Sequence, residues 1–407
     1  MFIVKTSSVL KGVVIVSSIF SYNIALAQTA TNQTSDVTIS ALSKVKGLSV
    51  DVAKLRLSSM NRMGDVQALL KRSFPDTFSY VSTLDAGQTF TIGIKGSDSS
   101  KVLNTITAIA QGLNISIKQV SMSKKDRTEL VDGIMNNLKT LKMAATISIN
   151  ERTDEVRILT KDPDAVKAAI AAGTLKVPSG VIVEESEGII LTDINWAGGS
   201  YINGQSGNTL EGCTAGFTVV DYDLTTPQYP FYGFVSAGHC IIANMKVDAY
   251  PNTTYPTSSA VSASLTSPFG ILNDAAFFQF SNQSTNHPRS GFWDGSQYTD
   301  LTGITEDYHG EFLCKYGRTS GKTCGFVEDV KTTDAYGTFS KVLATPAYPK
   351  QSVEGDSGGP VFITSSAAGI VHGRSANYDL YYSAATTWRA ATGYKVFYII
   401  GSNGYYR

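Results

Sequence analysis

One serine in this sequence has neighbours that suit nucleophilic chemistry. Ser357 lies within QSVEGDSGGPVF, residues 351–362, among small residues and next to an aspartate. A serine hydroxyl is a poor nucleophile at neutral pH unless a nearby base, usually a histidine, removes its proton. The sequence must therefore supply a histidine as the base and an acid that orients it.

The chain has only four histidines, and their surroundings differ. His239 lies near the end of GFVSAGHC, whose small and apolar residues are typical of a buried strand, and His372 lies in GIVHGR, the next apolar segment after Ser357. His287 and His309 stand in polar stretches typical of exposed loops. His239 is therefore the candidate base, although a core histidine can also serve only to bond backbone.

Asp274 is the candidate for the orienting acid. It precedes an apolar run in ILNDAAFFQF, and a carboxylate in such surroundings is costly to bury unless it is paired. A turn residue at a strand edge is the alternative for this aspartate. Its presence in one chain with His239 and Ser357 favours the catalytic interpretation.

The order of these residues along the chain separates two fold classes. GDSGG formally matches the G-x-S-x-G elbow of α/β-hydrolases, in which the order is serine, acid, histidine. No Asp or Glu lies between Ser357 and His372, the last histidine, and GGPVFITS is a poor helix. The order His239, Asp274, Ser357 is instead that of the chymotrypsin-type double β-barrel.

The segments SAGHC, NDAAFF and GDSGGPV resemble the three signatures of chymotrypsin-like serine proteases. GCTAGFTVV followed by GFVSAGHC, and CKYGRTSGKTCG, resemble the two disulfide loops of the bacterial α-lytic protease and streptogrisin branch. Five motifs in the same order make this resemblance specific, and it covers about residues 195–375. It implies a secreted serine endopeptidase made as a precursor, or zymogen.

The resemblance implies a role for each matching residue. Ser357 would be the nucleophile, His239 the general base and then acid, and Asp274 its orienting partner. The backbone N–H groups of Gly355 and Ser357 would form the oxyanion hole. For Asp356 we expect only a role in fixing the turn.

The resemblance also implies a disulfide pairing. All four cysteines lie in the second half of the chain, which fits export to an oxidising compartment. The two matching loops imply the bridges Cys213–Cys240 and Cys314–Cys324.

The substrate pocket departs from the usual pattern of this branch. Gln351 stands where the branch often has a cysteine, and His372-Gly373-Arg374 replaces the usual Ser-Gly-Gly or Ser-Trp-Gly. One hypothesis is that His372 or Arg374 lines the pocket and favours an acidic side chain before the scissile bond. The alternative is an apolar pocket with Arg374 pointing to solvent.

Two regions of the sequence differ in their pattern. Up to about residue 187 we expect a small α+β unit, with helices near 50–74, 101–113 and 126–142. A strand–turn–strand at 143–160 and a capped helix from Asp162 to Gly173 should follow. From about Gly188 onward, short apolar runs broken by turn residues predict an all-β barrel or sandwich, and the resemblance implies that it is the chymotrypsin-like double β-barrel.

The front of the chain predicts export and processing. Residues 1–27 combine Lys5 and Lys11, a short apolar run and ALA before residue 28, which is typical of a signal peptide; a membrane anchor is the alternative. Residues 28–195 would be a pro-region that assists folding, inhibits the enzyme and is removed between residues 188 and 197. Residues 196–407 would form the protease domain. A binding domain that stays attached is the alternative.

The sequence points to protein or peptide substrates and to the protein's own pro-region as partners. Its formal net charge of zero suggests neither nucleic acid nor membrane as a partner. We expect a secreted monomer that needs no cofactor or metal. The tail at 392–407 should be a final strand or helix. The competing functional class is a protease-like binding protein without catalysis.

Overall fold

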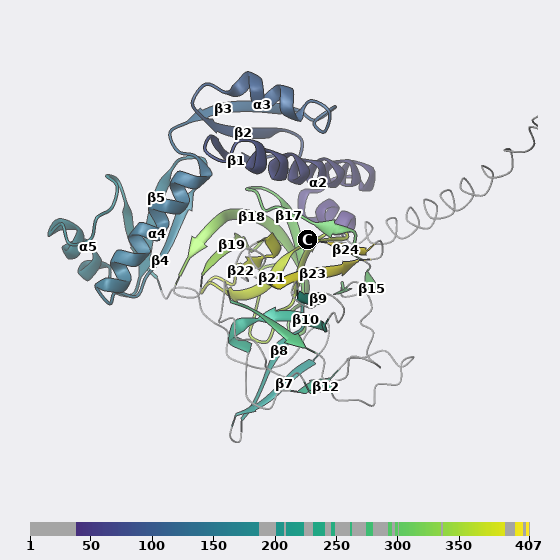
Figure 1. Ribbon diagram of the computed structural model, residues 1–407. Helices are drawn as coiled ribbons and strands as arrows, with labels where there is room; N and C mark the ends of the chain where they lie inside the picture. Colours follow the sequence, from purple (N-terminus) through teal and green to yellow (C-terminus); the bar gives the residue numbers. More distant parts are fainter. Residues whose placement is uncertain are drawn as a thin grey trace, which may run out of the picture.

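The computed structural model describes residues 38–186 and much of the remainder up to residue 406. Between 201 and 406 the exceptions are 207–208, 224–230, 241–245, 249–260, 263–273, 280–291, 295–297, 300, 335–336, 387–394 and 402–403. The expected signal peptide, the expected junction at 188–197 and His287 lie outside the described residues. Two α+β lobes border a β domain (Figure 1).

The first lobe packs one long helix against a small sheet. Helical residues 38–46 and α2 (Val50–Ser73) precede β1 (Phe78–Ser82) and β2 (Phe90–Lys95), which pair antiparallel, and α3 (Ser99–Ile106) leads to β3 (Ile115–Val120), parallel to β2. Helix α2 lies between this sheet and the β domain (Figure 1). The expected helix at 101–113 is shorter than predicted, because residues 107–112 form turns.

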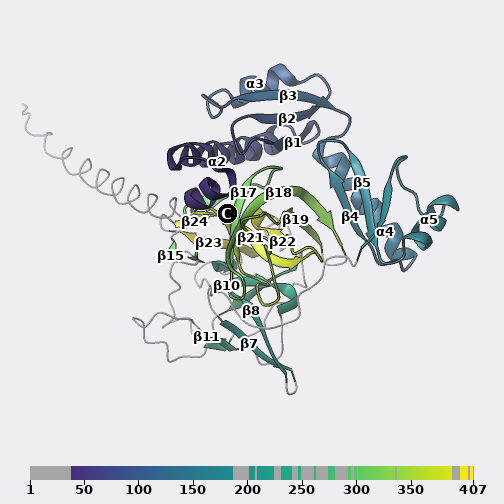
Figure 2. The same ribbon diagram turned by 180° about the vertical axis from the view of Figure 1, so that it is seen from behind.

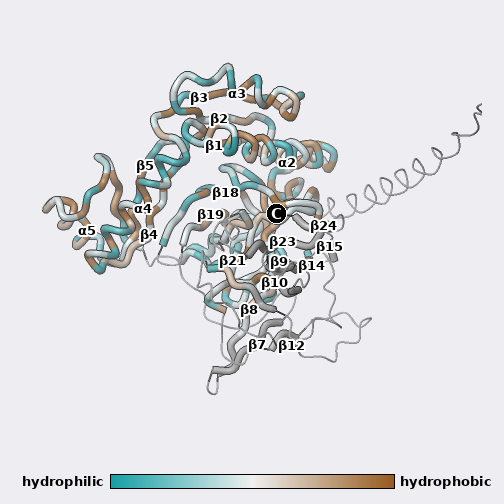
Figure 3. Tube along the Cα trace, viewed as in Figure 1, coloured by the Kyte–Doolittle hydropathy of each residue, from teal (hydrophilic) through white to brown (hydrophobic). Residues whose placement is uncertain are grey.

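The second lobe follows the predicted pattern closely. Helix α4 (Lys124–Thr140) precedes the antiparallel strands β4 (Thr146–Asn150) and β5 (Glu155–Thr160), and α5 (Pro163–Ala171) leads to β6 (Ile182–Glu185). Asp162 accepts a hydrogen bond from the Ala165 N–H, and Pro163 occupies the first turn of the helix, as expected. Polar and apolar residues alternate along these helices, so each presents an apolar side to its sheet (Figure 3).

The β domain contains the strands of two barrel halves. They are β7 (Tyr201–Ser206), β8 (Thr209–Thr214), β9 (Thr218–Asp223), β10 (Phe231–Ala237), β11 (Lys246–Asp248), β12 (Val261–Ser262), β13 (Ala275–Gln279), β14 (Phe292–Trp293), β15 (Tyr298–Thr299), β16 (Gly303–Ile304), β17 (Phe312–Gly317), β18 (Gly321–Thr333), β19 (Thr338–Val342), β20 (Pro360–Ile363), β21 (Ser366–Arg374), β22 (Leu380–Ala384), β23 (Lys395–Gly401) and β24 (Gly404–Tyr406).

The sheets of this domain join strands from distant parts of the chain. One sheet has the order β13-β10-β9-β23-β24 and a second has the order β12-β11-β7-β8. A third runs β17-β20-β21-β22-β19-β18 and continues into β4-β5-β6 of the second lobe. The architecture is the predicted chymotrypsin-like double β-barrel preceded by an α+β region, and the tail contributes the strands β23 and β24.

Strand β4 and helix α2 provide two of the contacts between the front lobes and the β domain. Strand β4 pairs antiparallel with the end of β18, through Ser148 opposite Thr332, and the two strands lie side by side in both views (Figures 1 and 2). Helix α2 packs on residues 305–311, where the Tyr308 hydroxyl donates to the carbonyl of Met60 over 3.0 Å. Among the described residues no helix is both long and apolar enough to span a bilayer.

Candidate active site

His239 and Asp274 meet where two paired strands end. His239 lies in the short 3-10 turn Gly238–Cys240 after β10, Asp274 directly precedes β13, and the two strands pair antiparallel. Asp274 Oδ1 accepts the backbone N–H of His239 over 2.7 Å, and Oδ2 lies 2.6 Å from His239 Nδ1. The ring therefore has a defined tautomer, with the proton on Nδ1 directed at the carboxylate.

The environment of Asp274 keeps its carboxylate ionised. Its side chain is completely buried, and burial alone would raise its pKa. The hydrogen bonds and positive charge of His239 and His372 outweigh that effect and lower the pKa of Asp274 to about 2. A fixed negative charge thus faces His239 over the whole neutral range.

Ser357 lies in a tight turn that rests on the strand leading to His239. Its carbonyl accepts the backbone N–H of Thr214 over 2.7 Å and lies 4.0 Å from Sγ of Cys240. Gly358 has a φ of +83°, and a Cβ there would collide with Ser236 and with the backbone of Thr214. Only glycine permits this approach, which sets the backbone of Ser357 against the residues flanking His239.

The second ring nitrogen of His239 is available for proton transfer. Nε2 is buried and has no hydrogen-bond partner among the residues that the structure describes. Since Nδ1 carries the proton shared with Asp274, Nε2 is the acceptor of the neutral ring. An imidazole arranged in this way can take a proton from a nearby hydroxyl.

The turn before Ser357 is held by more contacts than the sequence indicated. Asp356 accepts the backbone N–H groups of Val353, Thr319 and Ser320 over 3.0 to 3.1 Å, in line with its expected role in the turn. It also forms an ion pair of 2.7 Å with Nζ of Lys315, and both side chains are completely buried.

Sequence reasoning missed Lys315. Burial lowers the pKa of its ammonium group, and the charge of Asp356 offsets part of this effect. The signal was present in FLCKYG, where a lysine interrupts an otherwise apolar strand next to a cysteine. A buried lysine needs a carboxylate partner, and Asp356 is that partner.

Both predicted disulfides are formed. Cys213 is bonded to Cys240, which joins β8 to the His239 turn, and Cys314 is bonded to Cys324, which joins the paired strands β17 and β18. The first bridge ties His239 to the strand that also contacts the Ser357 turn.

Gln351, Gly373 and Arg374, three of the four residues expected at the pocket, have the following contacts. Gln351 is buried, and its Nε2 donates to the Cys324 carbonyl over 2.8 Å, so it braces the segment before Ser357. Gly373 pairs with Tyr381 of β22. Arg374 is partly exposed and places its guanidinium 5.0 Å from the ring centroid of Tyr378.

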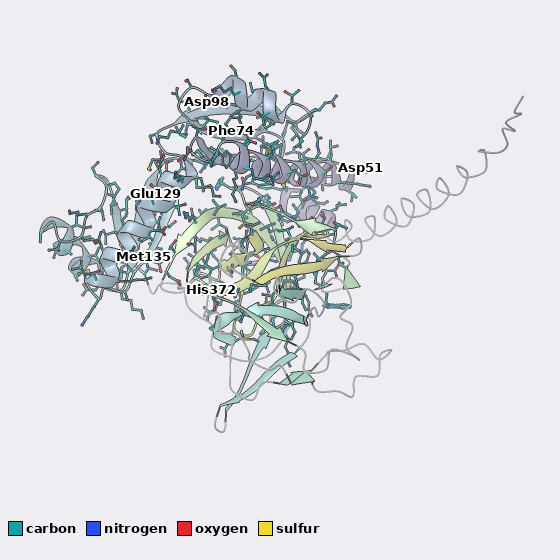
Figure 4. All side chains as sticks on the ribbon, in the orientation of Figure 1. Asp51, Phe74, Asp98, Glu129, Met135 and His372 are labelled. Carbon is teal, nitrogen blue, oxygen red and sulfur yellow. A yellow bond between two sulfur atoms is a disulfide. The ribbon has the colours of Figure 1, made fainter. Side chains whose placement is uncertain are left out.

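His372, which the sequence placed among the expected pocket residues, has contacts that the sequence did not indicate. It is completely buried within the β domain (Figure 4), and its Nδ1 lies 2.5 Å from Oδ2 of Asp274. Its ring stacks on Phe339, with 3.7 Å between centroids and 4° between the planes. The buried carboxylate draws the imidazole inward, because a charge without water requires partners. His309, predicted in an exposed loop, is half-buried and its carbonyl accepts the Thr83 N–H.

The donor atoms of His239, Asp274 and His372 lie within 4.8 Å of one another, as the ligands of a metal would. The Nδ1 atoms of both rings are, however, already hydrogen-bonded to the same carboxylate oxygen. A metal would have to displace these contacts, so the arrangement favours a proton-transfer network.

Comparison with known proteins places the chain among bacterial serine proteases. It is 24% identical to serine protease 1 of Rarobacter faecitabidus over 351 residues, which cover 86% of this chain and 61% of that protein. It is 25% identical to streptogrisin-C of Streptomyces griseus over 344 residues, covering 83% of this chain and 69% of that protein. The matched region thus spans less than two thirds of serine protease 1.

A shorter relative matches nearly in full. Serine protease 2 of Streptomyces fradiae is 30% identical over 181 residues, which are 44% of this chain and 95% of that protein. Among solved structures, a glutamic acid specific serine protease matches at 25% identity and a TM-score of 0.36, over 49% of this chain and 99% of the other. α-Lytic protease homologue N4 matches at 22% identity and a TM-score of 0.35, over 49% and 98%.

No protein-family model matches the sequence. The identity and nearly full coverage of the Streptomyces fradiae relative nevertheless agree with the order of the motifs and with the double-barrel architecture. The chain therefore belongs to the chymotrypsin-like serine proteases of the streptogrisin and α-lytic protease branch.

Proposed function

We propose that this protein is an endopeptidase that hydrolyses peptide bonds through Ser357, His239 and Asp274. The observation that carries the proposal is the 2.6 Å contact between His239 and the buried Asp274, next to the Ser357 turn. In the proposed reaction Ser357 Oγ attacks the scissile carbonyl carbon while His239 Nε2 takes its proton. His239 then returns the proton to the leaving amine, and water releases the acyl group by the same steps in reverse order.

We also assign the oxyanion hole to the backbone N–H groups of Gly355 and Ser357. The φ of +89° at Gly355 is a left-handed conformation that favours glycine, and the buried Lys315–Asp356 pair supports the turn between these groups. Loss of one such donor typically costs about 3–4 kcal/mol of transition-state stabilisation.

The front lobes are proposed to be a pro-region that assists folding, blocks the enzyme and is then removed. The pairing of β4 with β18 supports this role, since a strand already formed in the second lobe can template the barrel edge. The barrel depends on pairings between distant segments, which fold slowly because loop-closure entropy must be overcome first. Secretion directed by residues 1–27 belongs to the same proposal.

The preference of His372 or Arg374 for an acidic side chain before the scissile bond is part of this proposal, and the more exposed of the two is Arg374. Its partly exposed guanidinium lies over Tyr378 at the end of β21, whereas His372 is occupied by Asp274. A panel of peptides that differ only at that position tests it. Equal hydrolysis rates for peptides with glutamate and with leucine before the scissile bond would contradict the acidic preference. They would not bear on the proposed reaction.

The decisive experiment compares the secreted wild type with Ser357→Ala by intact mass and by hydrolysis of a general peptide substrate. We expect the wild type to lose its front segment and to cleave peptides, and Ser357→Ala to remain whole and inert. Ser352→Ala is the matched control, because Ser352 is a buried serine of the same segment and lies outside the proposed triad. A wild type that stays whole and inert would favour the protease-like binding protein.

A further inference from the structure

A second histidine shares the carboxylate that orients His239. Oδ2 of Asp274 lies 2.6 Å from Nδ1 of His239 and 2.5 Å from Nδ1 of His372. The two rings stand 6.0 Å apart, at an angle of 76° between their planes. The reaction proposed above uses only the ring of His239. The protonation state of His372 is set by the other groups around it.

A second carboxylate faces the other side of His372. Its Nε2 lies 3.6 Å from Oδ2 of Asp334, at the end of β18, so a carboxylate lies close to each ring nitrogen. Two carboxylates on opposite sides of one ring attract its positively charged form more strongly than its neutral form. The geometry therefore favours the doubly protonated ring. Burial opposes its positive charge, but the contacts with Asp274 and Asp334 outweigh burial and raise the pKa of His372.

The remaining ionisable groups around His372 have other partners or stay neutral. Tyr382 of β22 pairs with Val371, the residue before His372. It is completely buried, and burial raises its pKa well above the usual value. Lys341 of β19 pairs with Glu328 and Asp379, and Arg374 lies over Tyr378. The groups that face the His372 ring among the described residues are thus Asp274, Asp334 and, through Asp274, His239.

We propose that His372 is a positioning residue whose positive charge, held between Asp274 and Asp334, lowers the basicity of His239. This inference rests on the proposed function of His239 as the base. With His372 protonated, the two carboxylates and the imidazolium together carry one negative charge. A neutral side chain at position 372 would leave two negative charges behind His239, which would bind its proton more tightly.

The consequence is activity that extends to more acidic conditions. A base of lower pKa stays unprotonated at a lower pH, and the acidic limb of kcat/KM reports that pKa in the free enzyme. Phe339 keeps the His372 ring in place by stacking. In this proposal His372 changes the pKa of His239 through Asp274 and makes no contact with the substrate or the reacting atoms.

The test compares the wild type with His372→Asn and with the double variant His372→Asn/Asp334→Asn. Asparagine can still donate to Asp274 but carries no charge, and the double variant restores the single net negative charge of the wild type. We expect the midpoint of the acidic limb of kcat/KM to move up by about one pH unit in His372→Asn. In the double variant it should return to within a few tenths of a unit of the wild type.

A purely structural role for His372 predicts a different result. It would lower the maximal kcat/KM in both variants and leave the midpoint of the acidic limb unchanged. Adding Asp334→Asn would then lower kcat/KM further. Superimposable limbs for the wild type and His372→Asn, or a shift that Asp334→Asn does not reverse, would overturn the inference.

A second readout separates this inference from the proposed function. NMR titration of the His239 ring, recorded in the Ser357→Ala background, gives the pKa of His239 without any catalysis. We expect the pKa of His239 to rise in His372→Asn and to return toward the wild-type value in His372→Asn/Asp334→Asn. A wild type that neither reacts with a fluorophosphonate nor cleaves peptides would contradict the proposed function, whereas the NMR shift would still decide the role of His372.

Discussion

The Nζ atom of Lys315 lies 2.7 Å from Oδ2 of Asp356, and both side chains are completely buried. The pair stands directly before Ser357 and exists while the front lobes are still attached. A cation from strand β17 therefore holds the turn, and no newly freed chain end is needed for that purpose.

We predict that Lys315→Met destabilises the protein by about 3–5 kcal/mol, because it leaves the carboxylate of Asp356 buried without a counter-charge. Adding Asp356→Asn should recover most of this loss, since no charge then remains buried. Chemical unfolding of the full chain in the Ser357→Ala background, which prevents self-cleavage, measures both values. Equal destabilisation in the single and double variants would mean that the pair does not act through charge.

Asp274→Asn should lower kcat by about 10⁴-fold, because an amide no longer fixes the tautomer of His239. The fold should survive, since the side chain keeps its shape and can still accept the N–H of His239. Hydrolysis of a peptide substrate, with rates corrected for the fraction of folded protein, gives the value. A loss of less than tenfold would contradict the role assigned to Asp274.

The stability of the full chain should depend on Asp329, which accepts a hydrogen bond of 3.2 Å from Ser148 across the β4–β18 contact. Burial, followed by the charge of Glu328, raises the pKa of Asp329 to about 6. The folded state thus prefers the protonated acid. The associated stability is complete below the usual pKa of 3.8 and is lost as the pH rises through about 6.

Asp329→Asn should therefore stabilise the Ser357→Ala chain at pH 7 by about 1–2 kcal/mol and flatten the fall in stability between pH 4 and pH 7. Unfolding curves at several pH values provide the measurement. Glu129→Gln on α4 is the control, because it removes an exposed carboxylate of the second lobe (Figure 4). A steeper dependence in Asp329→Asn would refute the assignment.

Gly310 should be essential to the contact between the first lobe and the barrel. Its φ is +86°, and a Cβ would collide with the carbonyl of Thr83 in the front segment. Gly321, with a φ of +66°, has nothing within 4 Å of the corresponding position. Gly321→Ala should cost about 1–2 kcal/mol through backbone strain alone, and Gly310→Ala should cost more.

Thermal unfolding of both alanine variants in the Ser357→Ala full chain tests this difference. If Gly310→Ala and Gly321→Ala lower the free energy of unfolding equally, the carbonyl of Thr83 does not exclude a side chain at position 310.

The fold class and the candidate triad could be predicted because their signals are local in the sequence. Each motif places one candidate residue at the end of a recognisable strand or in a turn. Chain order and the poor helix after Ser357 argued against the α/β-hydrolase arrangement. The capped helix at Asp162 and the strand pair after residue 143 were predicted from neighbouring residues, because capping and turn formation depend on contacts within a few positions. Both disulfides followed from the resemblance.

The contacts that surround the site were decided only by the tertiary structure. Lys315 and Asp356 lie 41 positions apart, and Asp274 and His372 lie 98 apart. The contact of His372 with Asp274 was not predicted, because the sequence shows neither which carboxylate a strand residue will meet nor whether water reaches it. Local propensities determine the strands, whereas packing between distant strands determines which charges are buried together, and burial is what forces those charges to pair.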